Sequence, residues 1–416
     1  MSQPHTIEKN RFRNFSYVID RTRSHFDEAY SAGVMGLHGR SLATRHVQLS
    51  HAGVPGREIV DFVRCSYLGL DNHPMILSGA IAALQRHGAV HWSCARTRLN
   101  YDDLNMLESE LTELFRSNTI CFSNVMVTNM GALPLIASGH LTSGKKPVVA
   151  FDRECHISLQ YHKANVADET EVRTIKHNDM NMLEDLCKEG EPVAFICDGV
   201  YSMGGEAPIG DLQVLQEKYG LFLYIDDAHG ISLFGDHGQG YARAQFGSNL
   251  GDRTIIAASL AKGFGASGGI VMLGTSAQED LFRRYAQSYT FTAAPNVAAV
   301  GAARASARIH ASAELGHLQR KLAENIKLFD SKLVTPQFGN QLPIRMVPVG
   351  SEEASIAYSR DLLDRGFYTS ATFFPTVARG AASLRICITA THSASEISRL
   401  CDQINNMVEP GVTVAA

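Results

Sequence analysis

Lys262 is the residue whose type and setting could most directly do chemistry. It is a single amine between the hydroxyl of Ser259 and the glycine-rich stretch 263–269, and it follows the apolar run 254–258. A lysine that attacks a carbonyl must be held on rigid backbone and partly desolvated, so that its amine is neutral when it reacts. Small flanking residues let a flat ligand approach the backbone closely. The alternative is a solvated turn lysine, so the interpretation depends on partners elsewhere in the chain.

Polar clusters of this kind follow apolar runs that have the length of buried strands. These runs are 147–151, 193–197, 221–225 and 254–258, and the polar clusters directly after them are 152–156, 198–202, 226–229 and 259–262. In open α/β sheets, ligands bind beyond the carboxyl ends of the strands. We therefore expect the four clusters to converge on one pocket, with Lys262 among them.

The same alternation predicts the fold class. Continuous apolar strands separated by helical patterns, such as 180–189 and 212–219, favour an α/β fold whose mostly parallel sheet is covered on both faces. We expect further strands at 125–127 and 269–273. The helical periodicity of 306–334 predicts one long helix leading out of this sheet domain.

Beyond that helix the pattern changes, which predicts three parts. Residues 1–60 are expected to form an N-terminal arm, and residues 61–300 the large domain with the sheet. Residues 301–416 alternate short strands with helices and are expected to form a smaller α+β C-terminal domain.

Composition excludes several classes of protein. The chain has 416 residues, 45% of them hydrophobic, and a formal net charge of −4, which argues against a nucleic-acid partner. Its eight cysteines lack CxxC spacing, so we expect reduced thiols and no metal site. Residues 1–22 lack an apolar signal core and no stretch reaches membrane-spanning length, which predicts a cytoplasmic protein without a membrane partner.

The converging clusters meet the needs of pyridoxal 5'-phosphate (PLP). This cofactor requires an amine for its aldehyde, an anion for its ring nitrogen, donors for its phosphate and a flat group against its ring. Lys262 could supply the amine and Asp226 the anion. His229 could reach the ring hydroxyl, and His156 could stack on the ring. The alternatives are a helix-capping carboxylate for Asp226 and structural loop histidines.

Two serines of the same clusters could complete the cofactor site. Ser202 could donate to the ring hydroxyl, and Ser259 could bind the phosphate. Serine is common in turns, so a plain turn role is the alternative for each.

Taken together, the ordered motifs resemble the α-oxoamine synthase family of fold-type I PLP-dependent enzymes. The resemblance covers about residues 61–407, and some features are closer to the quorum-sensing autoinducer synthases of that family. The matching stretches are 67–70, 73–74, 152–158, 177–179, 202–208, 226–230, 262–269, 375–377, 384–386 and 388–393. The implied architecture is the fold-type I PLP-dependent transferase fold.

The resemblance also implies roles for individual residues. Lys262 would carry the cofactor and act as the base at the substrate Cα, and Arg385 would grip the amino-acid carboxylate with its bidentate fork. Thr290 or Thr292 would reach the phosphate in a neighbouring subunit, which implies a homodimer with shared active sites. The other implied cofactor contacts are Asp226 at the pyridine nitrogen, His156 on the ring, Ser202 and His229 at the ring hydroxyl, and Ser259 at the phosphate.

The implied reaction is a decarboxylative condensation of an amino acid with an acyl thioester, either acyl-CoA or acyl carrier protein. Its product is an α-amino ketone, which fits secondary-metabolite or signal-molecule biosynthesis. An aminotransferase or aldol-type lyase of the same fold is an alternative. A non-catalytic partner subunit is another, although the presence of Lys262 argues against it.

Departures from the family pattern lie around the expected pocket. Asn124, Val125 and Met126 stand where the family has serine, glycine and an aromatic residue, so we expect the backbone amides of Val125 and Met126 to bind the phosphate. Cys65 stands where the family has asparagine. These changes leave open which amino acid and which acyl donor the enzyme uses.

Overall fold

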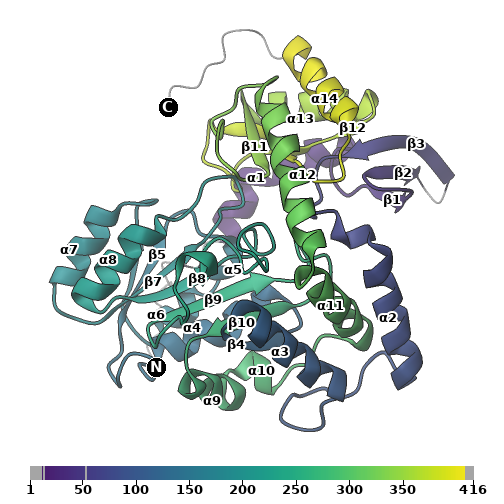
Figure 1. Ribbon diagram of the computed structural model, residues 1–416. Coiled ribbons are helices and arrows are strands. Elements are labelled where there is room, and N and C mark those ends of the chain that lie inside the picture. Colours follow the sequence, from purple (N-terminus) through teal and green to yellow (C-terminus); the bar gives the residue numbers. More distant parts are fainter. Residues whose placement is uncertain (1–11, 13–14, 52–53, 408–416) are drawn as a thin grey trace, which may run out of the picture.

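A mixed β-sheet lies at the centre of the large part of the molecule, with helices on both faces (Figure 1). The computed structural model describes residue 12 and residues 15–51 and 54–407. Within this described part, the central sheet has seven strands in the order β4 (Asn118–Phe122), β10 (Gly269–Leu273), β9 (Thr254–Ser259), β8 (Phe222–Asp226), β7 (Val193–Asp198), β5 (Val148–Asp152) and β6 (Val172–Ile175).

Most neighbouring strands of this sheet run parallel, as the sequence predicts. β9, β8, β7, β5 and β6 pair in parallel, while β10 is antiparallel to both β4 and β9. Alternate side chains of one strand enter opposite cores: Phe195 and Cys197 face one apolar cluster, and Ala194 and Ile196 face the other. A sheet buried on both faces explains why its strands are continuous apolar runs.

Two sets of helices cover these faces. One core includes side chains of α3 (Asp102–Phe115), α7 (Met180–Lys188), α8 (Ile209–Tyr219) and α11 (Val297–His310), and α2 (Pro74–His87) packs on α11. The other includes α4 (Val125–Ala137), α5 (Ile157–Gln160), α6 (Lys163–Ala167), α9 (Ser276–Tyr285) and α10 (Gln287–Thr290). Short 3₁₀ turns lie at η1 (Leu70–Asn72) and η2 (Arg243–Gln245). No helix in the described ranges is long and apolar enough to cross a membrane.

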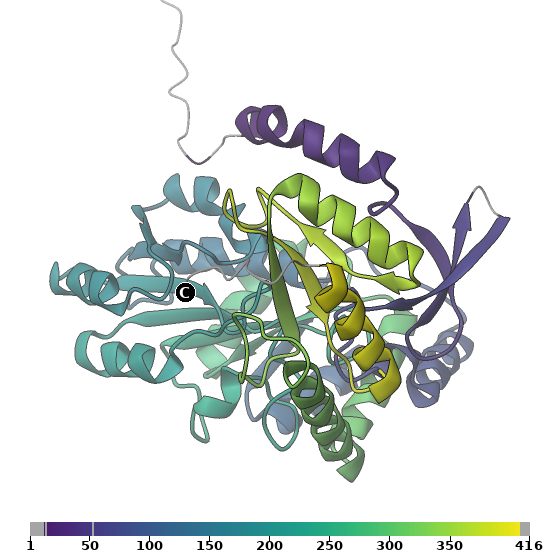
Figure 2. The same ribbon diagram turned by 90° about the horizontal axis from the view of Figure 1, so that it is seen from above.

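The C-terminal part forms a second, smaller layer that the N-terminal strands join. One sheet has the order β11 (Ile344–Gly350), β14 (Ala382–Cys387), β13 (Ser370–Thr372), and it packs with α12 (Ala313–Asp330), α13 (Glu352–Asp364) and α14 (Ala394–Met407). The other sheet has the order β1 (His38–Ser41), β2 (His46–His51), β3 (Val54–Asp61), β12 (Phe367–Tyr368). Figure 2 shows α1 (Phe15–Ser31) lying along α13. The division at residues 60 and 300 stays a prediction.

Two local predictions are wrong. Residues 125–127 begin helix α4 and do not form a strand, because Asn124 caps the helix by accepting a hydrogen bond from Val127 N at 3.0 Å. The long helix expected at 306–334 is interrupted: α11 ends at His310 and α12 begins at Ala313, with Ser312 as its N-cap. In both cases a short polar side chain satisfies helix amides and so sets the boundary.

Candidate active site

The four predicted polar clusters lie at one edge of the central sheet. Asp152, Asp198, Asp226 and Ser259 are the last residues of β5, β7, β8 and β9, which are neighbours in the sheet and run parallel. The register pairs Asp198 with Asp226. Lys262 follows Ser259 in the turn after β9. The expected convergence therefore follows from the strand order itself.

Lys262 is held by a short hydrogen-bonded chain. Its Nζ lies 2.8 Å from Nε2 of His229, and Nδ1 of the same ring lies 2.6 Å from the hydroxyl of Tyr67. His229 and Tyr67 are buried. A ring with one partner on each nitrogen can pass a proton between them, since one tautomer donates toward Tyr67 and the other toward Lys262. The hydrogen bonds fix the direction of the Lys262 amine and connect it through His229 to Tyr67.

The electrostatics of this chain favour a reactive amine. Burial lowers the pKa of Lys262, and Arg385 acts in the same direction, while Cys65 and Asp226 partly oppose them. Burial also lowers the pKa of His229 well below its usual range, and the nearby charge of Lys262 adds to this effect. A neutral imidazole can share a hydrogen bond with the Lys262 amine without placing a second positive charge beside it.

Asp226 is fixed by a second network that reaches it from helix α4. Asn129 Nδ2 donates to Asp226 Oδ2 at 2.9 Å, and the Tyr224 hydroxyl donates to Asn129 Oδ1 at 2.6 Å. The tyrosine thereby determines which way the amide is turned. Asp226 Oδ1 accepts from the backbone of Ala228 at 3.1 Å. The carboxylate is buried and oriented, as an anion that must face a ring nitrogen should be.

His156 presents an exposed imidazole at the same edge. The backbone N–H of Ser158 donates to Nδ1 of His156 at 3.2 Å, so Nδ1 is an acceptor and the ring proton lies on Nε2. The Ser158 hydroxyl lies 2.9 Å from the same nitrogen. Burial, with Lys262 and Arg385, lowers the pKa of His156 against the effect of Asp226. A neutral ring fixed in this way can lie flat against a ligand.

The start of α4 offers a place for a phosphate. Gly269 pairs with Phe122, the last residue of β4, and with Ser259, so one row of the sheet brings the α4 N-terminus beside Ser259. Helical hydrogen bonding starts with Thr128 N donating to Asn124 O, which leaves the amides of Val125 and Met126 in the first turn for an anion. A Cβ on Gly269 would approach Asn124 O to 2.5 Å, so this close approach requires glycine.

These residues fit PLP. An amine, a buried oriented anion and an exposed neutral imidazole surround one edge of the sheet, and a helix N-terminus with the buried Ser259 lies beside them. The set matches the aldehyde, the ring nitrogen, the ring face and the phosphate of the cofactor in turn. Ser202 contributes in a way that the sequence did not predict, because its backbone carbonyl accepts from Arg385 Nε at 2.7 Å.

Arg385 lies on β14, across the site from the sheet edge, and its other contacts are with sulfur. Nη1 lies 3.1 Å from Cys387 Sγ and Nη2 lies 3.6 Å from Cys65 Sγ. Burial alone would lower the pKa of Arg385, but the sulfurs of Cys387 and Cys65 raise it above the ordinary value. The guanidinium therefore stays charged in a buried place, as recognition of a carboxylate requires.

Thr290 and Thr292 lie at the end of α10 and outside these networks. The buried Thr290 donates to Gln287 O at 3.3 Å, and the half-buried Thr292 donates to Ser288 O. Phe291 between them is largely exposed. A contact of either threonine with a neighbouring subunit stays a prediction.

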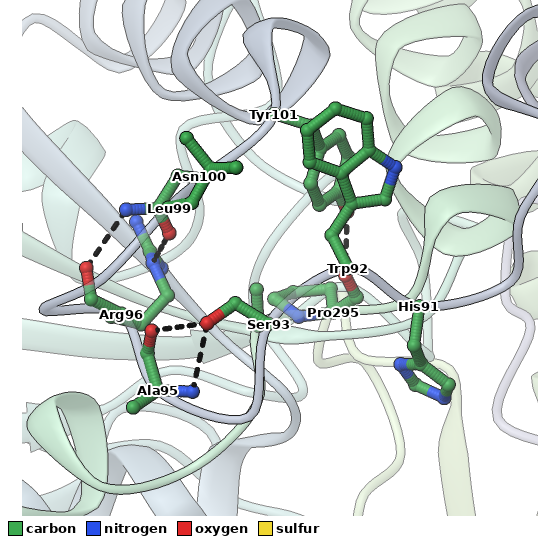
Figure 3. Close-up of a pocket in the computed structure, with 10 residues that line it drawn as sticks. His91, Trp92, Ser93, Ala95, Arg96, Leu99, Asn100, Tyr101 and Pro295 are labelled. Atoms are coloured by element: carbon green, nitrogen blue, oxygen red, sulfur yellow. Dashed lines mark hydrogen bonds between the residues drawn. The ribbon is translucent and has the colours of Figure 1, made fainter.

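The hollow drawn in Figure 3 is a different feature, formed by the loop between α2 and α3. Its volume is about 10 Å³, which is room for one water molecule at most. Tyr101 donates to Pro295 O at 2.6 Å, which fixes the loop on the segment before α11, and Arg96 Nε donates to Asn100 Oδ1 at 3.0 Å within the loop. None of the described residues that line it is a predicted site residue. We therefore assign it a structural role.

Sequence reasoning missed the partners that orient the predicted residues. Tyr67 lies in a matched motif, which was the available signal, but its contact with His229 joins positions 162 residues apart. Asn129 follows Thr128 in an otherwise apolar helix, and this polar pair could have marked it. No pattern in the sequence indicates that Cys65 and Cys387 meet, with their sulfurs 3.9 Å apart.

Comparisons with known proteins agree with this geometry. Residues 57–404 match the family described as aminotransferase class I and II. The 8-amino-7-oxononanoate synthase of Geobacter sulfurreducens is 32% identical over 388 residues, covering 91% of this chain and 96% of that protein. The enzyme of the same name from Alkaliphilus oremlandii is 30% identical, with 85% and 89% covered.

Solved structures show the same fold. Serine palmitoyltransferase from S. paucimobilis with a bound PLP–myriocin aldimine superposes with a TM-score of 0.82 at 20% identity, covering 95% of this chain and 98% of that chain. The serine palmitoyltransferase of Sphingomonas wittichii gives a TM-score of 0.81 at 20% identity over the same shares. At this identity the likeness concerns the fold alone.

Proposed function

This chain belongs to the aminotransferase class I and II family as an α-oxoamine synthase, and from that premise we propose which of its residues perform the family's reaction. The enzyme is a PLP-dependent acyltransferase that condenses an amino acid with an acyl thioester and releases carbon dioxide. The products are an α-amino ketone, carbon dioxide and the free thiol of the carrier. The assignments of individual residues below are our proposal.

Lys262 holds the cofactor and then acts as the base. When bound, PLP supplies an aldehyde that joins amines and a ring that withdraws electrons from the substrate Cα. Lys262 is suited to take the Cα proton once its amine is free, because burial lowers its pKa and His229 fixes its direction at 2.8 Å. Tyr67 supports His229 from the other ring nitrogen.

The remaining residues hold and orient. With PLP bound, Asp226 would pair with the ring nitrogen and favour its protonated form, and Asn129 holds the carboxylate in its orientation. His156 would lie against the ring, and Ser259 with the amides of Val125 and Met126 would hold the phosphate. Arg385, held by the carbonyl of Ser202, binds the carboxylate that the reaction later expels.

The observation that carries this proposal is the contact of Lys262 with His229 at the carboxyl end of β9, next to the oriented Asp226 on β8. A structural lysine would be expected to pair with a carboxylate, whereas this one lies against an imidazole that burial keeps neutral.

We also propose a homodimer with shared active sites. Large apolar side chains are exposed on neighbouring elements next to the site: Leu99 before α3, Met126 and Met130 on α4, Ile157 on α5 and Phe291 after α10. An apolar surface of this kind usually marks a protein contact. It adjoins Thr290 and Thr292, so a second copy bound there could receive either threonine at its phosphate.

The dimer is tested with matched surface variants. Phe291 and Val334 are both 78% exposed, but only Phe291 lies on the proposed interface. We expect Phe291→Asp to shift sedimentation equilibrium toward the monomer and Val334→Asp to leave it unchanged. Mixing Lys262→Ala with a Thr290→Val/Thr292→Val variant should restore activity if the sites are shared. Equal masses for both surface variants, or no restored activity, would contradict the proposal.

The acyl donor and the amino acid remain to be assigned by assay. Acyl-CoA and acyl carrier protein both present the thioester that the reaction consumes, and we propose that one of them is the donor. A role in signal-molecule or secondary-metabolite biosynthesis, and the cytoplasmic location, also stay predictions.

The reaction is tested by following both released products. The holoenzyme is mixed with a panel of amino acids and acyl thioesters while carbon dioxide and free thiol are measured. We expect the two to appear together in equal amounts. An aminotransferase or aldol-type lyase would convert the amino acid without releasing thiol. A colourless protein that takes up no PLP would instead indicate a non-catalytic partner subunit.

A further inference from the structure

The guanidinium of Arg385 has one strong partner and two weak ones. Nε donates to the Ser202 carbonyl at 2.7 Å, while Nη1 and Nη2 face the sulfurs of Cys387 and Cys65 at 3.1 and 3.6 Å. Sulfur is a weak acceptor compared with a carboxylate oxygen. The strong bond fixes where the fork is, and the two weak contacts can be exchanged for better ones.

The two sulfurs differ in how a ligand could reach them. Cys387 is fully buried at the end of β14, where its backbone N–H donates to Phe62 O at 2.7 Å. Cys65 is only half-buried, in the segment between β3 and Tyr67. Their sulfurs lie 3.9 Å apart. A substrate can therefore displace Cys65 from Arg385, while Cys387 remains behind it.

Charge is also unevenly divided between the sulfurs. The hydrogen bond from Cys387 holds the pKa of Cys65 well below its usual value, and the charges of Arg385 and Lys262 and a hydrogen bond from Tyr67 act in the same direction. The pKa of Cys387 is raised, because its proton is held between the sulfurs and because it is buried. The surroundings of Cys65 therefore favour its anionic form more than those of Cys387 do.

We propose that the Cys65 sulfur occupies the place on Arg385 that one oxygen of the substrate carboxylate takes, so that the Cys65–Cys387 pair sets how tightly the amino acid binds. The inference rests on the proposed role of Arg385 as the carboxylate site. Before the substrate arrives, the Cys65 sulfur lies 3.6 Å from Nη2 of Arg385. The incoming carboxylate must displace the Cys65 sulfur from Arg385. The Cys65–Cys387 pair therefore weakens amino-acid binding and sets how selective the site is at the carboxylate end of the substrate.

A matched pair of substitutions tests the competition. Cys65→Asp places a permanent carboxylate beside Arg385, and we expect it to raise the KM of the amino acid at least about tenfold. Cys65→Asn has nearly the same shape without the charge and should stay within about threefold of the native KM. The kcat should change little in either variant. Equal KM values for the two variants would overturn the proposal.

The pH dependence gives a readout that a purely structural role would not change. The groups that face Cys65 are Cys387 and Arg385 from β14, Tyr67 from its own segment and Lys262 from the turn after β9. Dividing the native KM by that of Cys65→Ser cancels the ionisation of the amino acid itself. We expect this ratio to rise with pH, by up to about tenfold per unit, as Cys65 loses its proton. A flat ratio would contradict the proposal.

Alkylation measures the sulfur directly. Iodoacetamide should modify Cys65 of the holoenzyme, and mass spectrometry should show that amino acids protect it whereas primary amines without a carboxylate do not. Cys387→Ala should move the midpoint of the alkylation pH profile upward, because the donor to the sulfur anion is lost. Alkylation of Cys65 at an unchanged rate in saturating amino acid would overturn the proposal.

Arg385→Gln separates the two levels of argument. If it leaves the KM of the amino acid unchanged, the proposed role of Arg385 fails. If it raises KM at least about tenfold while the Cys65 variants behave alike, only the proposal for the sulfur pair fails.

Discussion

The two sides of the active site are held together in different ways. The cofactor wall, which we define as Asp198, Asp226, Ser259 and Lys262, comes from neighbouring strands in fixed register, and short hydrogen bonds orient its groups. The substrate wall, defined as Cys65, Arg385 and Cys387, joins segments about 320 residues apart through sulfur contacts of 3.1 to 3.9 Å.

This difference separates chemistry from selectivity. Register in a sheet buried on both faces cannot slip without moving every side chain to the wrong face, so the cofactor wall is rigid. The substrate wall lies between the central sheet and the C-terminal layer and exchanges weak contacts for strong ones when a ligand binds. We therefore expect changes to the first wall to affect every substrate and changes to the second to act mainly on amino-acid binding.

The largest effect should come from Lys262→Ala. Removing the amine eliminates both the cofactor link and the base, so kcat should fall by roughly 10⁴-fold or more. The visible absorption band of the bound cofactor should disappear with it. Stopped-flow assays and absorption spectra measure both changes.

Lys163→Ala is the matched control for the lysine. Lys163 is buried, and its amine lies over the Phe151 ring at 5.2 Å and donates to Gln160 and Thr174, not to the groups around Lys262. It should lose stability without losing the absorption band. An active Lys262→Ala variant that keeps the band would contradict the assignment of the cofactor wall.

The next effect distinguishes two paired carboxylates on the same wall. Asp226→Asn should lower kcat by roughly 10²-fold, because the partner of the ring nitrogen loses its charge. Burial and the neighbouring Asp226 raise the pKa of Asp198 well above its usual range, which favours its neutral form. Asp198→Asn should therefore change kcat by less than about threefold. Steady-state kinetics of the two variants measure both kcat values. Equal losses of kcat would show that the charge of Asp226 is not what distinguishes the two carboxylates.

The cofactor wall could be predicted from the sequence because it depends on local patterns. An apolar run followed by a polar cluster indicates a strand end, and parallel strands bring their ends to one edge. This was sufficient to place Asp226 and Ser259 together with Lys262. The helix start at Val125, capped by Asn124, was not predicted, and binding of a phosphate by its free amides stays a prediction.

The substrate wall could not be predicted in this way. Cys65 and Cys387 are brought together by pairing between distant segments, and nothing near either residue indicates the other. The same holds for the tyrosine behind His229 and for the joining of β3 to β12, which ties the N-terminal strands to the C-terminal layer. Contacts of long sequence separation follow from the complete fold, not from its local patterns.

A smaller effect should follow from crowding the phosphate end of the cofactor wall. Gly269→Ala would bring a Cβ to 2.5 Å from Asn124 O, so the start of α4 must move. We expect a loss of about 1–3 kcal/mol in the free energy of unfolding and weaker PLP binding. Gly210→Ala on α8 is the control, since nothing lies within 4 Å of its added Cβ. Urea unfolding and PLP titration measure the two effects. A Gly269→Ala variant that lost stability but bound PLP normally would contradict the phosphate assignment.

The smallest effect concerns the support beneath the substrate wall. His46 on β2 lies 2.5 Å from Glu58 on β3 and 2.7 Å from Glu396 on α14, next to the strand that leads to Cys65. Burial acts to lower the pKa of His46, but the hydrogen bonds that its ring donates to Glu58 and Glu396 raise it above 6.5 overall. A histidine with a raised folded pKa stabilises the fold fully below its unfolded pKa, and this contribution is lost as pH rises through the folded pKa.

The free energy of unfolding of the native protein should therefore exceed that of His46→Gln most clearly below pH 6.5, the ordinary histidine value, and by less as the pH rises above it. Because His46 is partly exposed, we expect a difference of no more than about 1 kcal/mol. Urea unfolding at several pH values, in a double-mutant cycle with Glu396→Gln, measures it. If the difference in unfolding free energy grew with pH, a charged His46 paired with the two glutamates would be excluded. If the KM of the amino acid is unchanged in His46→Gln, selectivity resides in the substrate wall itself.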